Sequence, residues 1–432
     1  MFFKKYPKLT TSILYLFKSV FAILLCEIIL LTFTPYGNKS PLKQVVRPIE
    51  MFLRKNVARQ KELFTLEPLD NVFVGKRYNK NKTVIRDKGE FVLKYQLNSN
   101  GYRDYEENKN FKNEFRIISL GDSFTVGAGV GFDELYPSLL EKRLNCRVHK
   151  LSVGAHSNIE AFLHLQKFDH KADLVILGLW ESKMIYRDQQ FLVEYFDKIK
   201  NQIKDTEKLL QLAQLSSVEY KKVYSSPTER AKRYLVNNSA LYGFVTDRIK
   251  RINYVGDLLM RIGLVKSESG YTADITSNDH PYSLKKMRYA THIHPVMFRP
   301  SMGSSYFQLT FEIIMQMNEY LKKRNSELLV LLIPSLEQVY WPVFLNHNPK
   351  MNEFYKPELA NKLIVGFLKQ EEIHYLNMLP LLRSYVNPSM EVWDNNEEMY
   401  YGLDGHWTAK GHKITYEALY GYLISNRLIS AN

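Results

Sequence analysis

The sequence predicts an α/β protein in which a mostly parallel sheet of five strands lies between layers of helices. Five short runs with the length of strands, the first of them apolar, alternate with helical patterns along the chain. That order is typical of parallel strands joined by crossover helices. The first run leads straight into a glycine-rich turn and a helical pattern. The 432 residues, 45% of them hydrophobic and 24% charged, are enough for one large globular core.

The five expected strands are residues 115–120, 147–153, 173–179, 327–333 and 374–377. Each is a short segment of the length expected for a strand. Helical patterns lie between them, as at residues 159–167 and 359–369. The strands of such a sheet end at one edge, where open α/β sheets place their ligands. We therefore look for chemistry in the turns that follow the strands.

A long segment, residues 185–325, separates the third expected strand from the fourth. It contains helical patterns at residues 191–212, 226–236 and 241–262. Loops of this length usually carry function or form a subdomain, so we expect a helical insertion that caps the active face. His292 and His294 alternate there as on a strand, but no carboxylate pattern accompanies them. We interpret them as surface or packing residues rather than metal ligands.

The N-terminus predicts one transmembrane helix. Residues 11–34 are almost continuously apolar and long enough for one crossing. Lys18 and Glu27 are costly inside a bilayer and need an interface or a partner. A cleaved signal peptide is the alternative, but no small-residue cleavage pattern follows, which favours an uncleaved anchor. We divide the chain into an anchor at 1–36, a polar and basic juxtamembrane linker at 37–96, and a main domain at 97–430. Within the linker we expect a helix near residues 48–63.

Charge and cysteine usage exclude some functions. The net charge is +14, but the basic residues are scattered and form no known nucleic-acid-binding motif. We predict no nucleic-acid partner, and an anionic membrane surface or an acidic glycan is the alternative. Cys26 lies in the expected anchor, so it cannot form a disulfide with Cys146 inside the domain. No Cys/His cluster has zinc spacing, and we predict neither a metal nor another cofactor.

Two motifs at opposite ends of the main domain point to acyl chemistry. Gly121-Asp122-Ser123 follows the first strand, at a helix N-terminus whose N–H groups suit a developing oxyanion. Asp404-Gly405-His406-Trp407 precedes the last helical pattern and offers a base with an orienting carboxylate. His412 is a rival base, although its Gly-His context looks structural. The structural alternative for the first motif is a turn that only caps a helix.

Together the two motifs resemble those of the SGNH (GDSL-like) hydrolases. Gly121-Asp122-Ser123 matches the family's first block, and Asp404-Gly405-His406-Trp407 matches its last block in the Asp-x-His-Trp form. That form occurs in the membrane-linked branch that includes polysaccharide O-acetyltransferases, and residues 98–104 look like the lead-in of that branch. The resemblance covers residues 97–423. It implies a three-layer α/β/α, flavodoxin-like fold.

The resemblance also implies roles for individual residues. Ser123 would be the nucleophile, His406 the base, and Asp404 the group that holds the imidazole tautomer. Ser123 N–H would be the first oxyanion donor. The family's second block supplies a glycine after the second strand, and Gly154 is the nearest one. A small alignment slip would instead place Ala155 or Ser157 at that position.

The third block departs from the family pattern. An asparagine is expected after the third strand, but alignment on Gly178 places Trp180 there. Loss of one oxyanion donor can cost about 2.7–4 kcal/mol in the barrier. Either a nearby residue substitutes, or the protein is a weak or inactive relative. The candidate substitutes are Trp180, Ser182, Lys183 and Asn158.

We therefore expect a serine-dependent, metal-independent esterase or O-acyltransferase that passes through an acyl-Ser123 intermediate. The resemblance suggests acyl, chiefly acetyl, esters of a cell-surface or extracellular glycan, with a membrane protein as the acyl-donor partner of a transferase. It also places the domain outside the cytoplasm. The charges do not decide the orientation, since basic residues flank both ends of the expected anchor and the larger number follows it. Three alternatives stay open: a lipid-directed lipase or thioesterase, a non-catalytic glycan-binding or assembly protein, and a scaffold whose insertion binds a membrane protein.

Overall fold

The computed structural model describes residues 64–65, 73–87, 91–106, 113–168, 171–181, 184–213, 305–347, 356–390, 393–402 and 404–429. The chain divides into two compact units, and all of these residues belong to the unit that comprises both residues 62–219 and residues 268–432. No helix within these ranges has the length and apolar character needed to cross a membrane. The expected anchor, and the expected helices at 226–236 and 241–262, lie outside the described residues.

The predicted parallel sheet of five strands is confirmed, with every neighbouring pair parallel. Its order is β6-β5-β7-β8-β9, the 2-1-3-4-5 order of flavodoxin-like sheets. β8 and β9 have the predicted bounds, whereas β6 ends three residues early. The strands are β5 (Asn113–Gly121), β6 (Cys146–Lys150), β7 (Leu174–Trp180), β8 (Glu327–Ile333) and β9 (His374–Asn377).

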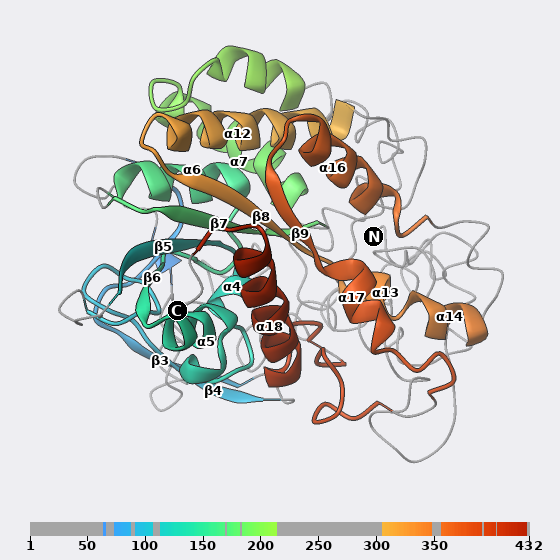
Figure 1. Ribbon diagram of the computed structural model, residues 1–432. Coiled ribbons are helices and arrows are strands. Elements are labelled where there is room, and N and C mark those ends of the chain that lie inside the picture. The colour runs from blue at the N-terminus through green and yellow to red at the C-terminus, as the bar shows by residue number, and fades with distance from the viewer. Residues whose placement is uncertain are drawn as a thin grey trace, which may run out of the picture. The chain divides into compact units, whose positions relative to one another are not determined.

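Helices cover both faces of this sheet. α6 (Asn158–Lys167), α7 (Met184–Ile199), α12 (Ser305–Lys322) and α16 (Leu359–Gln370) pack on β5, β7, β8 and β9 and on one another. In Figure 1 the first three of them lie above the sheet, while α5 (Tyr136–Leu144) and α18 (Ala409–Ser425) lie below it. β7 is buried along its whole length, as expected for a strand covered on both faces.

The connection from β7 to β8 begins with α7 and ends with α12, so both described ends of the expected insertion are crossover helices of the sandwich. Four short helices also occur among the described residues, and most of them follow strands at the carboxyl edge of the sheet. They are α4 (Ser123–Val126), α13 (Leu336–Val339), α14 (Trp341–His347) and α17 (Met378–Ser384). A 3-10 turn, η2 (Phe132–Glu134), precedes α5.

Part of the segment expected to link the anchor to the domain packs against the domain. β3 (Thr83–Asp87) and β4 (Val92–Gln96) form an antiparallel hairpin, and β1 (Phe64–Thr65) pairs with β2 (Arg77–Tyr78). The N–H of Lys76 donates to Glu160 Oε1 on α6 at 2.9 Å. Tyr78 is buried and accepts a hydrogen bond from the loop after β6. The structured domain therefore starts before residue 97.

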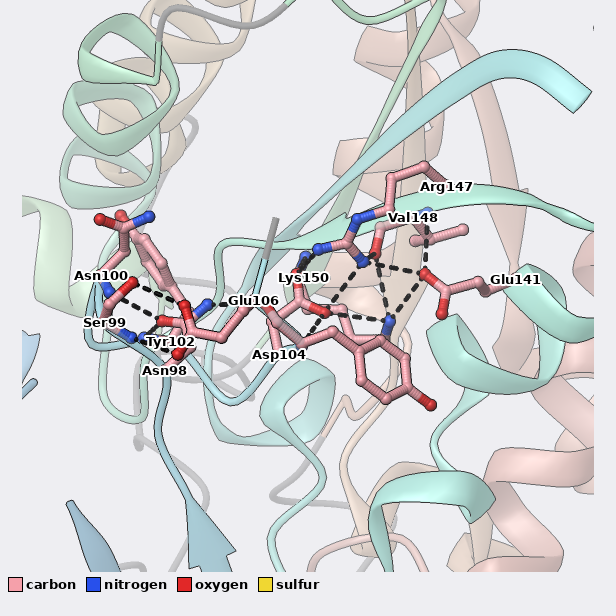
Figure 2. A network of polar contacts seen from close by, with 11 residues as sticks. Asn98, Ser99, Asn100, Tyr102, Asp104, Glu106, Glu141, Arg147, Val148 and Lys150 are labelled. Carbon is pink, nitrogen blue, oxygen red and sulfur yellow. Dashed lines mark hydrogen bonds and ion pairs between the residues drawn. The ribbon is translucent and has the colours of Figure 1, made fainter. Parts of the chain in front are cut away.

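The lead-in at residues 98–104 is fixed by a buried ionic network (Figure 2). Asp104 accepts from Arg147 at 2.8 Å and lies 3.4 Å from Lys150 Nζ, and both cations also contact Glu141. Burial alone would raise the pKa of Asp104, but Lys150 and Arg147 outweigh burial and lower it. Two cations balance two carboxylates, which is the condition under which buried charges are tolerated. The network ties the lead-in to β6 and α5.

Arg103, next to that network, supports the turn after Ser123. Its guanidinium donates to the carbonyl oxygens of Val126, Gly127 and Val130, each at 2.8 Å. These carbonyls lie at and just beyond the C-terminus of α4, where a helix leaves acceptors without intrahelical partners and favours a cation. The lead-in thus also supports the turn that follows Ser123, at the C-terminus of α4.

Candidate active site

Ser123 is the first residue of α4 and directly follows β5. Asp122 is the N-cap, and its Oδ1 accepts from Phe124 N–H at 3.1 Å. Gly121 pairs with Gly178 on β7, and a Cβ on either glycine would collide with the side chain of Thr125. Glycine at both positions therefore lets α4 approach the strand ends. Ser123 lies at the point where the strand order reverses, the usual ligand site of this topology.

A short hairpin brings Asp404 and His406 to the same place. Tyr400 bridges Trp407 in antiparallel fashion, and Tyr401 N–H donates to His406 O at 2.8 Å. Gly405 turns the chain with a φ of +78°, a conformation that glycine adopts at no steric cost. The turn therefore places the side chains of Asp404 and His406 beside each other.

The three side chains form a continuous hydrogen-bonded chain. Asp404 Oδ1 contacts His406 Nδ1, and His406 Nε2 lies 2.7 Å from Ser123 Oγ. The contacts expected from the sequence are present. With a carboxylate on Nδ1, the proton of a neutral imidazole resides there, and Nε2 is left to accept from the serine hydroxyl. The side chains of His406 and Asp404 are 15% and 12% exposed, so the pair is shielded but reachable.

Aromatic rings pack against the side chains of this hydrogen-bonded triad. The ring of Phe124 lies 4.9 Å from the His406 ring, 5.2 Å from the Trp407 ring and 5.0 Å from the Trp180 ring. Phe124 and Trp407 are buried. The tryptophan of the Asp-x-His-Trp motif therefore packs under the nucleophile turn, where it fixes the position of the imidazole relative to Ser123.

His412 belongs to the core. Its Nδ1 accepts the N–H of Tyr136 at 3.3 Å, and its ring stacks on Tyr136 and meets Trp407 edge-on. Burial lowers the pKa of His412 to about 3. The structure thus gives His406, and not His412, the contact with Ser123.

The loop after β6 differs from the expectation at Gly154. The N–H of Gly154 donates to Tyr78 Oη at 2.8 Å, so it is not directed at an oxyanion here. Tyr78 comes from the N-terminal segment, and no motif in the sequence announces this contact. Ala155, the next residue, has a φ of +66°, a conformation that suits glycine. Within the described ranges its N–H has no acceptor, so Ala155 fits the place of the family's second-block glycine better.

The four residues that could replace the third-block asparagine differ in where the structure places them. Trp180 occupies the expected position, and its ring lies 6.2 Å from the His406 ring. Asn158 is committed elsewhere: its N–H and Nδ2 donate to the carboxylate of Asp188 at 2.6 and 2.7 Å. Ser182 and Lys183 lie outside the described residues.

Sequence reasoning missed Arg187, on α7. Its Nη1 donates to Asp122 Oδ2 at 2.9 Å and to the carbonyl oxygen of His156 at 3.1 Å. The guanidinium carbon lies 5.6 Å from the centroid of the Trp180 ring. Asp122 is fully buried, whereas the Arg187 side chain is 18% exposed. Only the position of Arg187 shortly after the third block could have drawn attention to it.

Two buried acids stand behind the same loops. Burial raises the pKa of Asp188 to about 6, although Asn158, Thr310 and Ile159 N–H donate to it. Burial likewise raises the pKa of Glu181 to about 7, against donation from the side-chain amides of Gln338 and Asn361. Asp188 accepts from the first N–H groups of α6 and so holds the loop after β6 in place.

No group of three His, Cys, Asp or Glu side chains with metal-binding geometry occurs among the residues that the structure describes.

Neither a family model nor a curated protein matches the chain. Among solved structures, it is similar to the acetyl xylan esterase AlAXEase at 10% identity, with 72% of this chain and all of that one covered and a TM-score of 0.36. Phospholipase A1 from Streptomyces albidoflavus NA297 matches at 11% identity, 72% and 100% coverage and a TM-score of 0.36. TesA matches at 12% identity, 73% and 99% coverage and a TM-score of 0.32. Likenesses at these TM-scores carry no argument about function.

Proposed function

We propose that the chain is a serine-dependent enzyme that cleaves or transfers carboxylic esters through an acyl-Ser123 intermediate. The observation that carries this proposal is the hydrogen-bonded chain from Asp404 through His406 to Ser123 Oγ. A serine hydroxyl is a weak nucleophile unless an adjacent base takes its proton. Here the base is in hydrogen-bond contact with the hydroxyl and is itself oriented by a carboxylate, which is the arrangement that acyl transfer requires.

The geometry assigns each step to a residue. Ser123 Oγ attacks the ester carbonyl as its proton moves to His406 Nε2. Asp404 stabilises the imidazolium that forms, and His406 returns the proton to the departing alcohol oxygen. A second alcohol or water then attacks the acyl-Ser123, again through His406. Water gives an esterase and a sugar hydroxyl gives a transferase, with the same three residues.

The test is labelling with a fluorophosphonate probe, which reacts with activated serines. The detergent-solubilised wild type should label, and both Ser123→Ala and His406→Ala should lose labelling. Ser389→Ala, an exposed serine far along the chain, is the matched control and should label like the wild type. A folded wild type that does not label would contradict the proposal and favour a non-catalytic binding protein.

We further propose that the substrate is an acyl ester, chiefly acetyl, of a glycan outside the cytoplasm. The support is the Asp404-Gly405-His406-Trp407 motif, with Trp407 packed under the nucleophile turn, together with the predicted N-terminal anchor. Short esters should then be turned over faster than long ones. Faster hydrolysis of p-nitrophenyl palmitate than of p-nitrophenyl acetate would instead indicate a lipid-directed enzyme. Protease protection of the domain in intact cells would test the proposed topology.

A further inference from the structure

Arg187 carries hydrogen-bond donors that the protein does not use. A guanidinium has five N–H donors. The Nη1 group serves Asp122 and the His156 carbonyl, which accounts for both of its protons. The Nε and Nη2 donors have no acceptor within the part of the chain that the structure describes. Largely buried donors are normally satisfied. The side chain keeps 18% exposure, so it is not sealed from solvent.

The contacts of Arg187 connect it to the segments that surround the reacting serine. Asp122, one acceptor, directly precedes Ser123 in the chain. His156, the other, directly follows Ala155 in the loop after β6. The indole of Trp180, against which the guanidinium lies, also contacts the His406 ring. Arg187 therefore lies where the turn after β5, the loop after β6 and the end of β7 converge.

We propose that Arg187 donates to the ester carbonyl oxygen and to the oxyanion that develops from it, in place of an asparagine amide after β7. This inference rests on the proposed function and deepens it. A charge-assisted hydrogen bond is roughly twice as strong as a neutral one. Two fixed contacts on Nη1 hold the guanidinium in one orientation before the substrate arrives, and such preorganisation makes a donor effective.

The electron and proton balance needs no further group. As the Ser123 Oγ–carbon bond forms, the carbonyl π electrons move onto the oxygen, and the serine proton moves to His406. Arg187 takes no part in the proton transfer and acts only as a hydrogen-bond donor. When the oxyanion collapses, the bond to the alcohol oxygen breaks and His406 protonates the leaving group. Arg187 thus changes only the energy of the tetrahedral state.

A purely structural role would act through Asp122, whose buried carboxylate needs a cationic partner. The experiment separates the two roles with four variants of the full-length protein: Arg187→Gln, Arg187→Lys, Asp122→Asn and the double Asp122→Asn/Arg187→Gln. Glutamine keeps an amide but loses the charge and the fork. Asparagine at 122 is also a good N-cap and removes the carboxylate that Arg187→Gln would strand. The readouts are kcat and KM for p-nitrophenyl acetate, with thermal unfolding followed by circular dichroism.

Arg187→Gln should lower kcat by about 10²–10³-fold with KM changed only a few-fold, as expected for loss of an oxyanion donor. Arg187→Lys should recover only part of the loss, because a point charge does not reproduce the fork. The double variant should lose the same factor relative to Asp122→Asn alone. If Arg187→Gln does not fold, the double variant and Arg187→Lys provide the test.

Three results would overturn the inference. A kcat of Arg187→Gln within about 3-fold of the wild type, far from the effect of a lost donor, would show that Arg187 does not contact the reacting oxygen. Recovery of kcat in the double variant would show that Arg187 serves only Asp122. A change in KM alone would indicate substrate anchoring. A folded wild type that neither reacts with the fluorophosphonate probe nor hydrolyses the ester through Ser123 would refute the proposed function itself, and this inference with it.

Discussion

The two sides of the candidate site are built in different ways. On the acid–base side, Asp404 and His406 are two residues apart in one hairpin and reach Ser123 together. On the donor side, Arg187 joins Asp122 and His156, which are 65 and 31 residues away from it. The residues of the acid–base side are adjacent in one short sequence motif. Those of the donor side come together only when the sheet has formed. A motif search therefore finds the base and misses the donor.

The two sides also differ in what holds them. Aromatic packing by Phe124 and Trp407 fixes the imidazole, whereas the buried carboxylate of Asp122 and the backbone carbonyl of His156 fix Arg187. Aromatic packing tolerates changes of pH and salt, and its loss shows mainly as instability. When a buried polar contact loses one partner, the group left unpaired destabilises the protein, and a residue held by that contact can lose its position as well. The variants below test this contrast, beginning with the largest effect.

Asp404→Asn should break the acid–base side most severely. The amide would favour the wrong tautomer of His406, so that Nε2 carries the proton and cannot accept from Ser123. A loss in kcat of about 10⁴-fold is expected for such a change. Steady-state hydrolysis of p-nitrophenyl acetate measures it. Asp197→Asn, at a highly exposed surface pair, is the control and should leave kcat unchanged. Near-normal kcat in Asp404→Asn would mean that another group orients the base.

Trp407→Ala should destabilise the protein more than it changes the chemistry of a folded molecule. Trp407 is buried against Phe124, Tyr136 and His412, and removal of a core tryptophan costs about 3–5 kcal/mol. Urea unfolding gives the change in free energy. Trp407→Phe keeps most of the ring contacts and should cost clearly less, while Val193→Ala, at an exposed position, should cost almost nothing. Equal costs for Trp407→Ala and Val193→Ala would contradict the packing role.

The sequence predicted the parallel sheet because short strands alternate with helical patterns along the chain. β8, a continuous apolar run, and the half-buried β9 both have the predicted bounds. It predicted the Ser123–His406–Asp404 contacts because a resemblance in two blocks implied them. It placed the second donor at Gly154, since a glycine in the sequence is visible and an alanine at a positive φ is not. Tyr78 and Arg187 act through contacts between distant segments, which no local pattern encodes.

The buried network around Asp104 allows the support of the site to be weakened without touching its chemistry. Asp104→Asn removes the charge that Arg147 and Lys150 share. Loss of hydrogen bonds to charged groups of this kind costs about 1.5–3 kcal/mol. Urea unfolding should show this loss, while kcat of the folded variant falls much less than in Asp404→Asn. Asp133→Asn, an exposed acid nearby in sequence, is the control. A stability equal to that of the wild type would show that the network is not a support.

Acidification from neutral pH should have the smallest effect of these changes on the free energy of unfolding. It should also show which side of the site opens first. Burial lowers the pKa of His156, His164 and His412 from the usual 6.5 to about 3. Below pH 6.5 the unfolded chain binds protons at these residues and the folded chain does not. The stability is therefore complete above that value and is lost progressively as the pH falls toward 3. Between about pH 7 and 6 the loss is under about 1 kcal/mol per histidine.

Urea unfolding at several pH values between 7 and 5 measures this slope, and the position of each histidine gives it meaning. His164 packs against His156 beside the loop that accepts from Arg187, whereas His412 packs beneath the acid–base side against Trp407. His164→Gln and His412→Gln should each reduce the slope, because each removes one proton-binding difference. If activity is lost at a higher pH than the one at which the protein unfolds, and only His164→Gln keeps activity down to the pH of unfolding, the donor side opens first. A flat stability profile would show that these histidines are already charged in the folded state.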